Sequence, residues 1–163
     1  MVATSPTVVD ALILSALLRG RRLTSELTSY AISWPEFAYL IEIVWRVDRR
    51  PKKPAMMSAV EQLAFRGGRR SSMWIPVLIE IGRLTDLDNT GIQLVMPPPE
   101  AAADFALAVT GSGLLPREAT NLVISEWRGW NFLATPQTIT DRMRRALNER
   151  NITWREVDLS ELK

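Results

Sequence analysis

The sequence of 163 residues contains no cysteine and no histidine. Without cysteine, the chain cannot form disulfides, use a thiolate nucleophile or build a Cys-ligated zinc or iron–sulfur site. Without histidine, it lacks the usual general base and the commonest metal ligand. Any catalytic chemistry must therefore rely on carboxylates, hydroxyls, lysine, arginine or a hard cation.

Long hydrophobic runs are also missing from the sequence. No apolar stretch reaches the roughly 18 residues that a transmembrane helix needs. The first residues do not form a basic segment followed by an apolar core, as a signal peptide would. We therefore expect a soluble, cytoplasmic protein without membrane association. An excess of one charge is nearly absent too, since the chain has 20 Lys and Arg and 18 Asp and Glu. The resulting net charge of +2 only weakly favours an anionic partner.

The composition that is present is that of an ordinary globular domain. Apolar residues make up 47% of the chain and charged residues 23%. A chain of this length can bury a substantial core. We expect one domain that spans residues 1–163.

The apolar pattern predicts short strands separated by helices. Strands are expected at Thr7–Val9, Ala31–Ser33, Ile92–Met96, Trp130–Ala134 and Ile152–Leu159. Helices are expected after Asp10 as far as Gly20, and at Thr24–Tyr30, Pro35–Trp45, Ala55–Phe65, Ser72–Leu84, Pro99–Val109, Pro116–Arg128 and Ile139–Arg150. This alternation favours a mostly parallel sheet with helices on both faces, and it places Val8, Ile32, Leu94 and Leu133 on buried strands.

Asp10 stands directly after the first predicted strand. A parallel strand would deliver its carboxylate to the carboxyl edge of the sheet, where open α/β sheets bind ligands. Asp is also a favoured N-cap, so the same residue can simply begin the helix that follows. The sequence leaves both interpretations open.

Two of the six tryptophans lie in apolar helical stripes. Trp45 and Trp127 are therefore predicted to be core residues. Base stacking by the other tryptophans is the less favoured alternative.

Four short motifs resemble those of the PIN domain, the fold of many toxin ribonucleases of toxin–antitoxin pairs. Residues 8–18 are similar to the opening strand, first acid and following helix of that family. Residues 31–36 look like the second strand and the helix that carries the second acid. Residues 113–119, Gly-Leu-Leu-Pro-Arg-Glu-Ala, resemble the segment with the third acid, and residues 132–135 resemble the later strand that ends in Thr. The resemblance implies a PIN-like three-layer α/β/α fold with a central, mostly parallel sheet.

The resemblance also implies an acidic site. Its catalytic residues would be Asp10, Glu36 and Glu118, and Glu42 is the alternative second acid. The chain departs from the family at the third acid, which is Glu in place of Asp. It departs again at the fourth acid, where Gln137 stands and Asp141 is the nearest substitute.

The function implied by the resemblance is metal-dependent hydrolysis of RNA phosphodiesters. Converging carboxylates would hold Mg²⁺ or Mn²⁺, and the metal would activate water. Phosphates would be held by Arg19, Arg21, Arg117 and Arg142. The implied partners are RNA, an antitoxin protein and a second copy of the chain as a homodimer.

Two alternatives remain beside the ribonuclease. The weakened acidic motif can belong to a catalytically degenerate PIN-like module that binds RNA or a protein partner. The three acids can also be separate helix-start residues, since the helix dipole favours acids in first turns.

Overall fold

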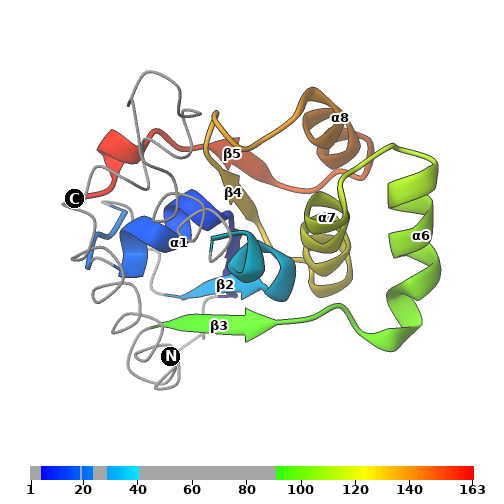
Figure 1. Ribbon diagram of the computed structural model, residues 1–163, viewed down its shortest axis with the longest axis horizontal. Coiled ribbons are helices and arrows are strands. Elements are labelled where there is room, and N and C mark those ends of the chain that lie inside the picture. The colour runs from blue at the N-terminus through cyan, green and yellow to red at the C-terminus, as the bar shows by residue number, and fades with distance from the viewer. Residues whose placement is uncertain (1–4, 19, 24–28, 41–90) are drawn as a thin grey trace, which may run out of the picture.

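The computed structural model describes residues 5–18, 20–23, 29–40 and 91–163. These residues contain a sheet of five strands that all pair in parallel (Figure 1). The strands are β1 (Thr7–Val9), β2 (Tyr30–Ser33), β3 (Ile92–Val95), β4 (Phe132–Ala134) and β5 (Trp154–Glu156). Their order is β3-β2-β1-β4-β5, so the predicted parallel α/β sheet is confirmed.

Helices connect the strands, as parallel pairing requires. They are α1 (Ala11–Leu18), a helix over residues 34–40, the 3₁₀ turn η2 (Pro99–Ala101), α6 (Ala102–Thr110), α7 (Pro116–Arg128) and α8 (Asp141–Glu149). The 3₁₀ turn η3 (Leu159–Glu161) follows β5. The expected helices at 55–65 and 72–84 lie outside the described residues, as does nearly all of the one at 24–30.

Apolar residues cover both faces of the sheet and build two cores. Successive residues of a strand point to opposite faces, so Val9 packs in a core with Leu14 of α1, whereas Val8 packs in a second core with Leu122 of α7 and Leu147 of α8. Figure 1 shows α1 on one side of the strands and α7 and α8 on the other. The result is a three-layer α/β/α arrangement.

Several sequence predictions need correction at the level of single residues. Tyr30 was expected to end a helix but begins β2, where it is 1% exposed. Val8, Ile32 and Leu133 are buried as predicted, whereas Leu94 is only half-buried because β3 is the last strand of the described sheet. The strands predicted at 92–96, 130–134 and 152–159 are each shorter in the structure.

Trp127 is a second correction, because it was predicted to be a core residue. Its side chain is 46% exposed, and its indole N–H donates to Asp104 at 2.9 Å. The apolar stripe of α7 is made instead by Ala119, Leu122 and Val123. Trp45, the other predicted core tryptophan, lies outside the described residues.

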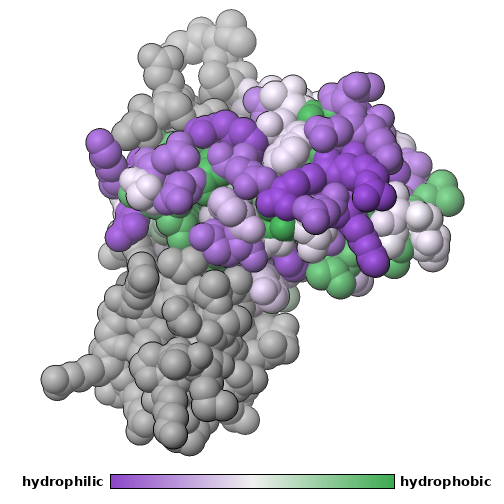
Figure 2. Space-filling view, turned by 90° about the horizontal axis from the view of Figure 1, so that it is seen from above, coloured by the Kyte–Doolittle hydropathy of each residue, from purple (hydrophilic) through white to green (hydrophobic). Residues whose placement is uncertain are grey.

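The surface of the described part is mainly hydrophilic on the face that Figure 2 shows, with smaller hydrophobic groups between. Among the described residues, no helix has the length and the apolarity needed to cross a bilayer.

Candidate functional site

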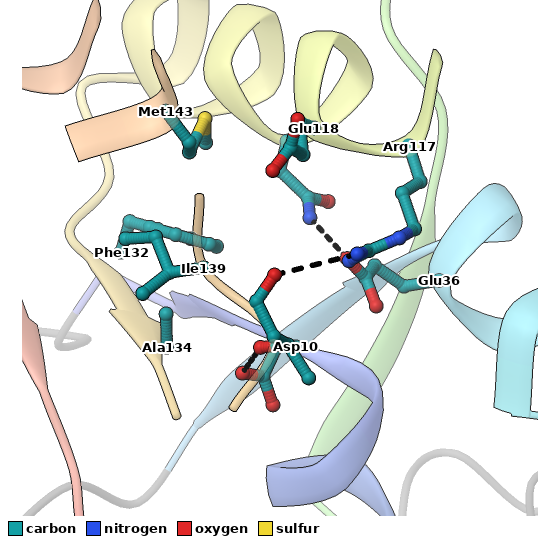
Figure 3. A pocket seen from close by; sticks show the side chains of 10 residues that line it. Asp10, Glu36, Arg117, Glu118, Phe132, Ala134, Ile139 and Met143 are labelled. Atoms are coloured by element: carbon teal, nitrogen blue, oxygen red, sulfur yellow. Dashed lines mark hydrogen bonds and ion pairs between the residues drawn. The ribbon is translucent and has the colours of Figure 1, made fainter. Parts of the chain in front are cut away.

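A small pocket opens beside the carboxyl ends of the strands, below the first turn of α7 (Figure 3). Its polar lining consists of Asp10, Glu36, Arg117, Glu118, Asn121 and Thr138, and its apolar lining of Phe132, Ala134, Ile139 and Met143. The chain leaves β1 toward β2 on one side and has β4 on the other, so β1 marks the topological switch point of the sheet. Crevices at such points are the usual ligand sites of open α/β sheets.

Asp10 follows β1 and is 1% exposed. Its Oδ1 accepts hydrogen bonds from the backbone N–H groups of Leu12 at 3.0 Å and Ile13 at 2.9 Å, which confirms the N-cap interpretation. Its Oδ2 faces away from the helix and accepts from the backbone N–H and the hydroxyl of Thr135 and from the hydroxyl of Thr138. Asp10 therefore joins the start of α1 to the loop after β4.

Glu36 lies in the helix that follows β2 and is 1% exposed. Its Oε1 accepts from Arg117 at 3.0 Å and from the amide of Asn121 at 2.8 Å, and its Oε2 accepts from the backbone N–H of Ala11 at 2.9 Å. Burial raises the pKa of Glu36 to about 7; the nearby Asp10 adds to this shift, and Arg117 opposes it. Glu36 lies in the first turn of its own helix, and its carboxylate joins this helix to α7 and to the start of α1.

Glu118 lies in the first turn of α7 and is 3% exposed. Its Oε2 accepts from the backbone N–H of Leu115, the N-cap residue, at 3.1 Å. Its Oε1 accepts from the hydroxyl of Thr140 at 2.8 Å, and Thr140 in turn caps α8. The helix-start interpretation of this acid is confirmed, and the same carboxylate lines the pocket.

Arg117 is the cation of the pocket. Its guanidinium lies 4.4 Å from the ring centre of Tyr39 and donates to the carbonyl of Thr138 at 3.3 Å, in addition to the ion pair with Glu36. The side chain is only 16% exposed. Figure 3 shows it reaching from α7 toward Glu36. The guanidinium of Arg117 therefore points into the protein. An arginine that binds phosphate would instead expose its guanidinium to solvent.

The other predicted site residues lie elsewhere. Arg21 follows the far end of α1, whose eight residues carry the chain about 12 Å away from Asp10. The side chain of Asp141 is 88% exposed and pairs with Arg144. Arg142 is exposed beside Met143 and donates to the carbonyl of Gly113 at 3.1 Å. Arg19 and Glu42 lie outside the described residues.

The position of the missing fourth acid is filled in another way. Gln137 is exposed, and the next residue, Thr138, is buried with its hydroxyl on Asp10. A neutral hydrogen-bond donor one residue after the position of the fourth acid therefore bonds to Asp10. Thr138 was not predicted as a site residue, and its single hydroxyl gives no sequence signal of this role.

Asn121 is the other site residue that the sequence did not single out. Its amide donates to Glu36, and its carbonyl accepts from the hydroxyl of Ser33 at 2.7 Å. Glu118, Asn121 and Ser125 recur every three or four residues on one face of α7. All three are buried. The sequence signal for Asn121 was therefore this polar stripe, on a helix that packs against the sheet.

The carboxylates of the pocket do not fit Mg²⁺ in the arrangement described. A carboxylate offers about four lone-pair sites, and Asp10 already accepts five hydrogen bonds. Glu36 accepts three hydrogen bonds, one of them from Arg117, and Glu118 accepts two, so a metal ion at Glu36 would have to compete with the guanidinium of Arg117. Within the part of the chain that the structure describes, no group of three or more acidic side chains is arranged so that it could hold a metal ion.

Comparisons with known proteins add no family assignment, because neither a protein-family model nor a curated protein sequence matches the chain.

Proposed function

We propose that this chain is a PIN-like domain that binds RNA and does not cleave it, and that its acidic pocket holds no divalent metal. The proposal depends chiefly on one observation: the ion pair between Arg117 and Glu36 inside the pocket, at 3.0 Å. A positive side chain of the protein itself lies among the acids where a nuclease needs a cation. The parallel sheet and the pocket at its switch point support the PIN-like part of the proposal.

RNA is the ligand that we favour, since α8, which contributes Met143 to the pocket lining, also carries exposed arginines. These are Arg142, which is next to Met143 in the chain, and Arg145. Arg142 uses one guanidinium nitrogen on Gly113 and keeps further N–H groups for a phosphate. Binding of this kind is electrostatic and must weaken as salt increases.

The experiment is a titration of a labelled, single-stranded random RNA, followed by fluorescence anisotropy and by denaturing gels. We expect the same affinity in Mg²⁺ and in EDTA at matched ionic strength, a linear loss of log affinity with log salt, and intact RNA. Arg142→Gln should lower the salt slope by about 1, as expected for one lost phosphate contact.

Arg21→Gln provides the matched control. It removes the same charge at the far end of α1, so its salt slope should equal that of the wild type. If both variants behave alike, Arg142 is not a phosphate contact. A second outcome is that the wild type binds no RNA but binds a protein in a manner that depends on Arg142. The protein-binding alternative would then replace the proposal.

A metal-dependent ribonuclease is the second candidate, because Asp10, Glu36 and Glu118 do line one pocket. Mg²⁺- or Mn²⁺-dependent cleavage by the wild type, lost in Asp10→Asn, would establish it and overturn our proposal. Gln137→Asp supplies the missing acid. Under our proposal this variant also leaves RNA intact, because Arg117 still pairs with Glu36.

A further inference from the structure

Three acidic side chains line the pocket, and a positive charge nearby lowers the cost of burying them as carboxylates. A bound divalent cation is one solution. A basic side chain of the chain itself is the other. The two solutions predict different responses to added metal.

We infer that Arg117 is the built-in counter-cation of this pocket and occupies the space that a divalent metal would otherwise take. Its Nη1 lies 3.0 Å from Oε1 of Glu36, the buried carboxylate that bridges α7 and the start of α1. It is held there by more than charge, because the ring of Tyr39 stacks on the guanidinium and the carbonyl of Thr138 accepts from Nη2.

The charge balance within the described pocket supports this assignment. Among its lining residues, the acids are Asp10, Glu36 and Glu118, and Arg117 is the single basic one. The neighbouring arginines do not reach the acids: Arg142 donates to the backbone of Gly113, and Arg144 pairs with Asp141 and Glu156. Removal of the Arg117 charge therefore leaves Glu36 without its partner cation.

The inference predicts a gain of metal binding when Arg117 is neutralised. We expect Arg117→Gln to bind Mn²⁺ at least about tenfold more tightly than the wild type in calorimetric titrations, because two unit charges a few ångströms apart in a partly buried site interact far more strongly than this factor requires. The thermal midpoint of the variant, and not that of the wild type, should increase with added Mn²⁺.

Two control variants locate the effect. Arg21→Gln removes an exposed arginine beyond the far end of α1 and should leave Mn²⁺ affinity at the wild-type value. The double variant Arg117→Gln/Glu36→Gln should lose the gained affinity, because the unpaired carboxylate is then absent. Equal Mn²⁺ affinity of Arg117→Gln and the wild type would overturn the inference.

If Arg117→Gln does not fold, Arg117→Met is the alternative variant, because its side chain can keep the contact with Tyr39. A measurement on the wild type gives an independent test, since the side-chain NMR signal of Arg117 must shift whenever Mg²⁺ enters the pocket. Metal occupancy with an unshifted Arg117 signal would also overturn the inference. The proposed function is judged separately, by RNA binding and cleavage of the wild type.

Discussion

Asp10→Ala is expected to lower the free energy of unfolding by about 3–5 kcal/mol, which adds the loss of an N-cap to the cost of buried donors left without an acceptor. The carboxylate is 1% exposed and accepts from two backbone N–H groups of α1. It also accepts from Thr135 and Thr138. Urea denaturation monitored by circular dichroism measures the effect.

Asp141→Ala is the matched control for this substitution. Asp141 is also an acid at a helix start, but its side chain is 88% exposed and pairs with Arg144 one helical turn away. Its loss should cost less than about 1 kcal/mol, as is usual for surface pairs and first-turn acids. Equal effects of the two substitutions would show that Asp10 acts as a helix cap and no more.

The second large effect is a decrease in stability as the pH increases from 5 to 8. The pKa of Glu36 is raised by burial from 4.5 in the unfolded chain to about 7 in the folded one. The folded state therefore binds the proton more tightly, and the stabilisation is complete below pH 4.5 and lost as the pH passes 7. We expect the free energy of unfolding to fall by about 2–3 kcal/mol across this range.

Glu36→Gln carries no ionisable group at this position and should lose that part of the pH dependence. Glu149→Gln removes an exposed carboxylate of α8 and should retain the wild-type profile. Tyr30, whose pKa burial raises above 10, does not titrate in this range. Denaturation at pH 5, 6, 7 and 8 separates the outcomes, and a flat wild-type profile would contradict the prediction.

Apart from individual boundaries, much of the described fold was accessible from the sequence. Short, mostly apolar strands that alternate with helical stripes favour parallel pairing, because parallel neighbours need a crossover between them. Parallel strands then gather their carboxyl ends at one edge. For that reason Asp10 could be expected at a site on this edge, whereas Glu36 and Glu118 joined it only through the resemblance to the PIN domain. All three line one pocket in the structure.

The prediction of Trp127 failed for a physical reason. The rotation of a helix about its own axis decides which of its side chains face the sheet. The sequence of α7 does not fix this rotation. In the structure the buried polar face with Asn121 turns toward the pocket, and this rotation exposes Trp127 near α6, where it pairs with Asp104.

By itself, therefore, the sequence determined the layers of the described fold and the edge of the sheet that carries the pocket, with Asp10 at that edge. These properties follow from local periodicity and chain direction. Only the tertiary structure decided which hydrogen-bond donors and which cation contact the buried acids. The contacts of Thr138 with Asp10, and of Asn121 and Arg117 with Glu36, join residues 81 to 128 positions apart. Such contacts depend on the strand order and on the rotation of the helices against the sheet, which no local pattern encodes.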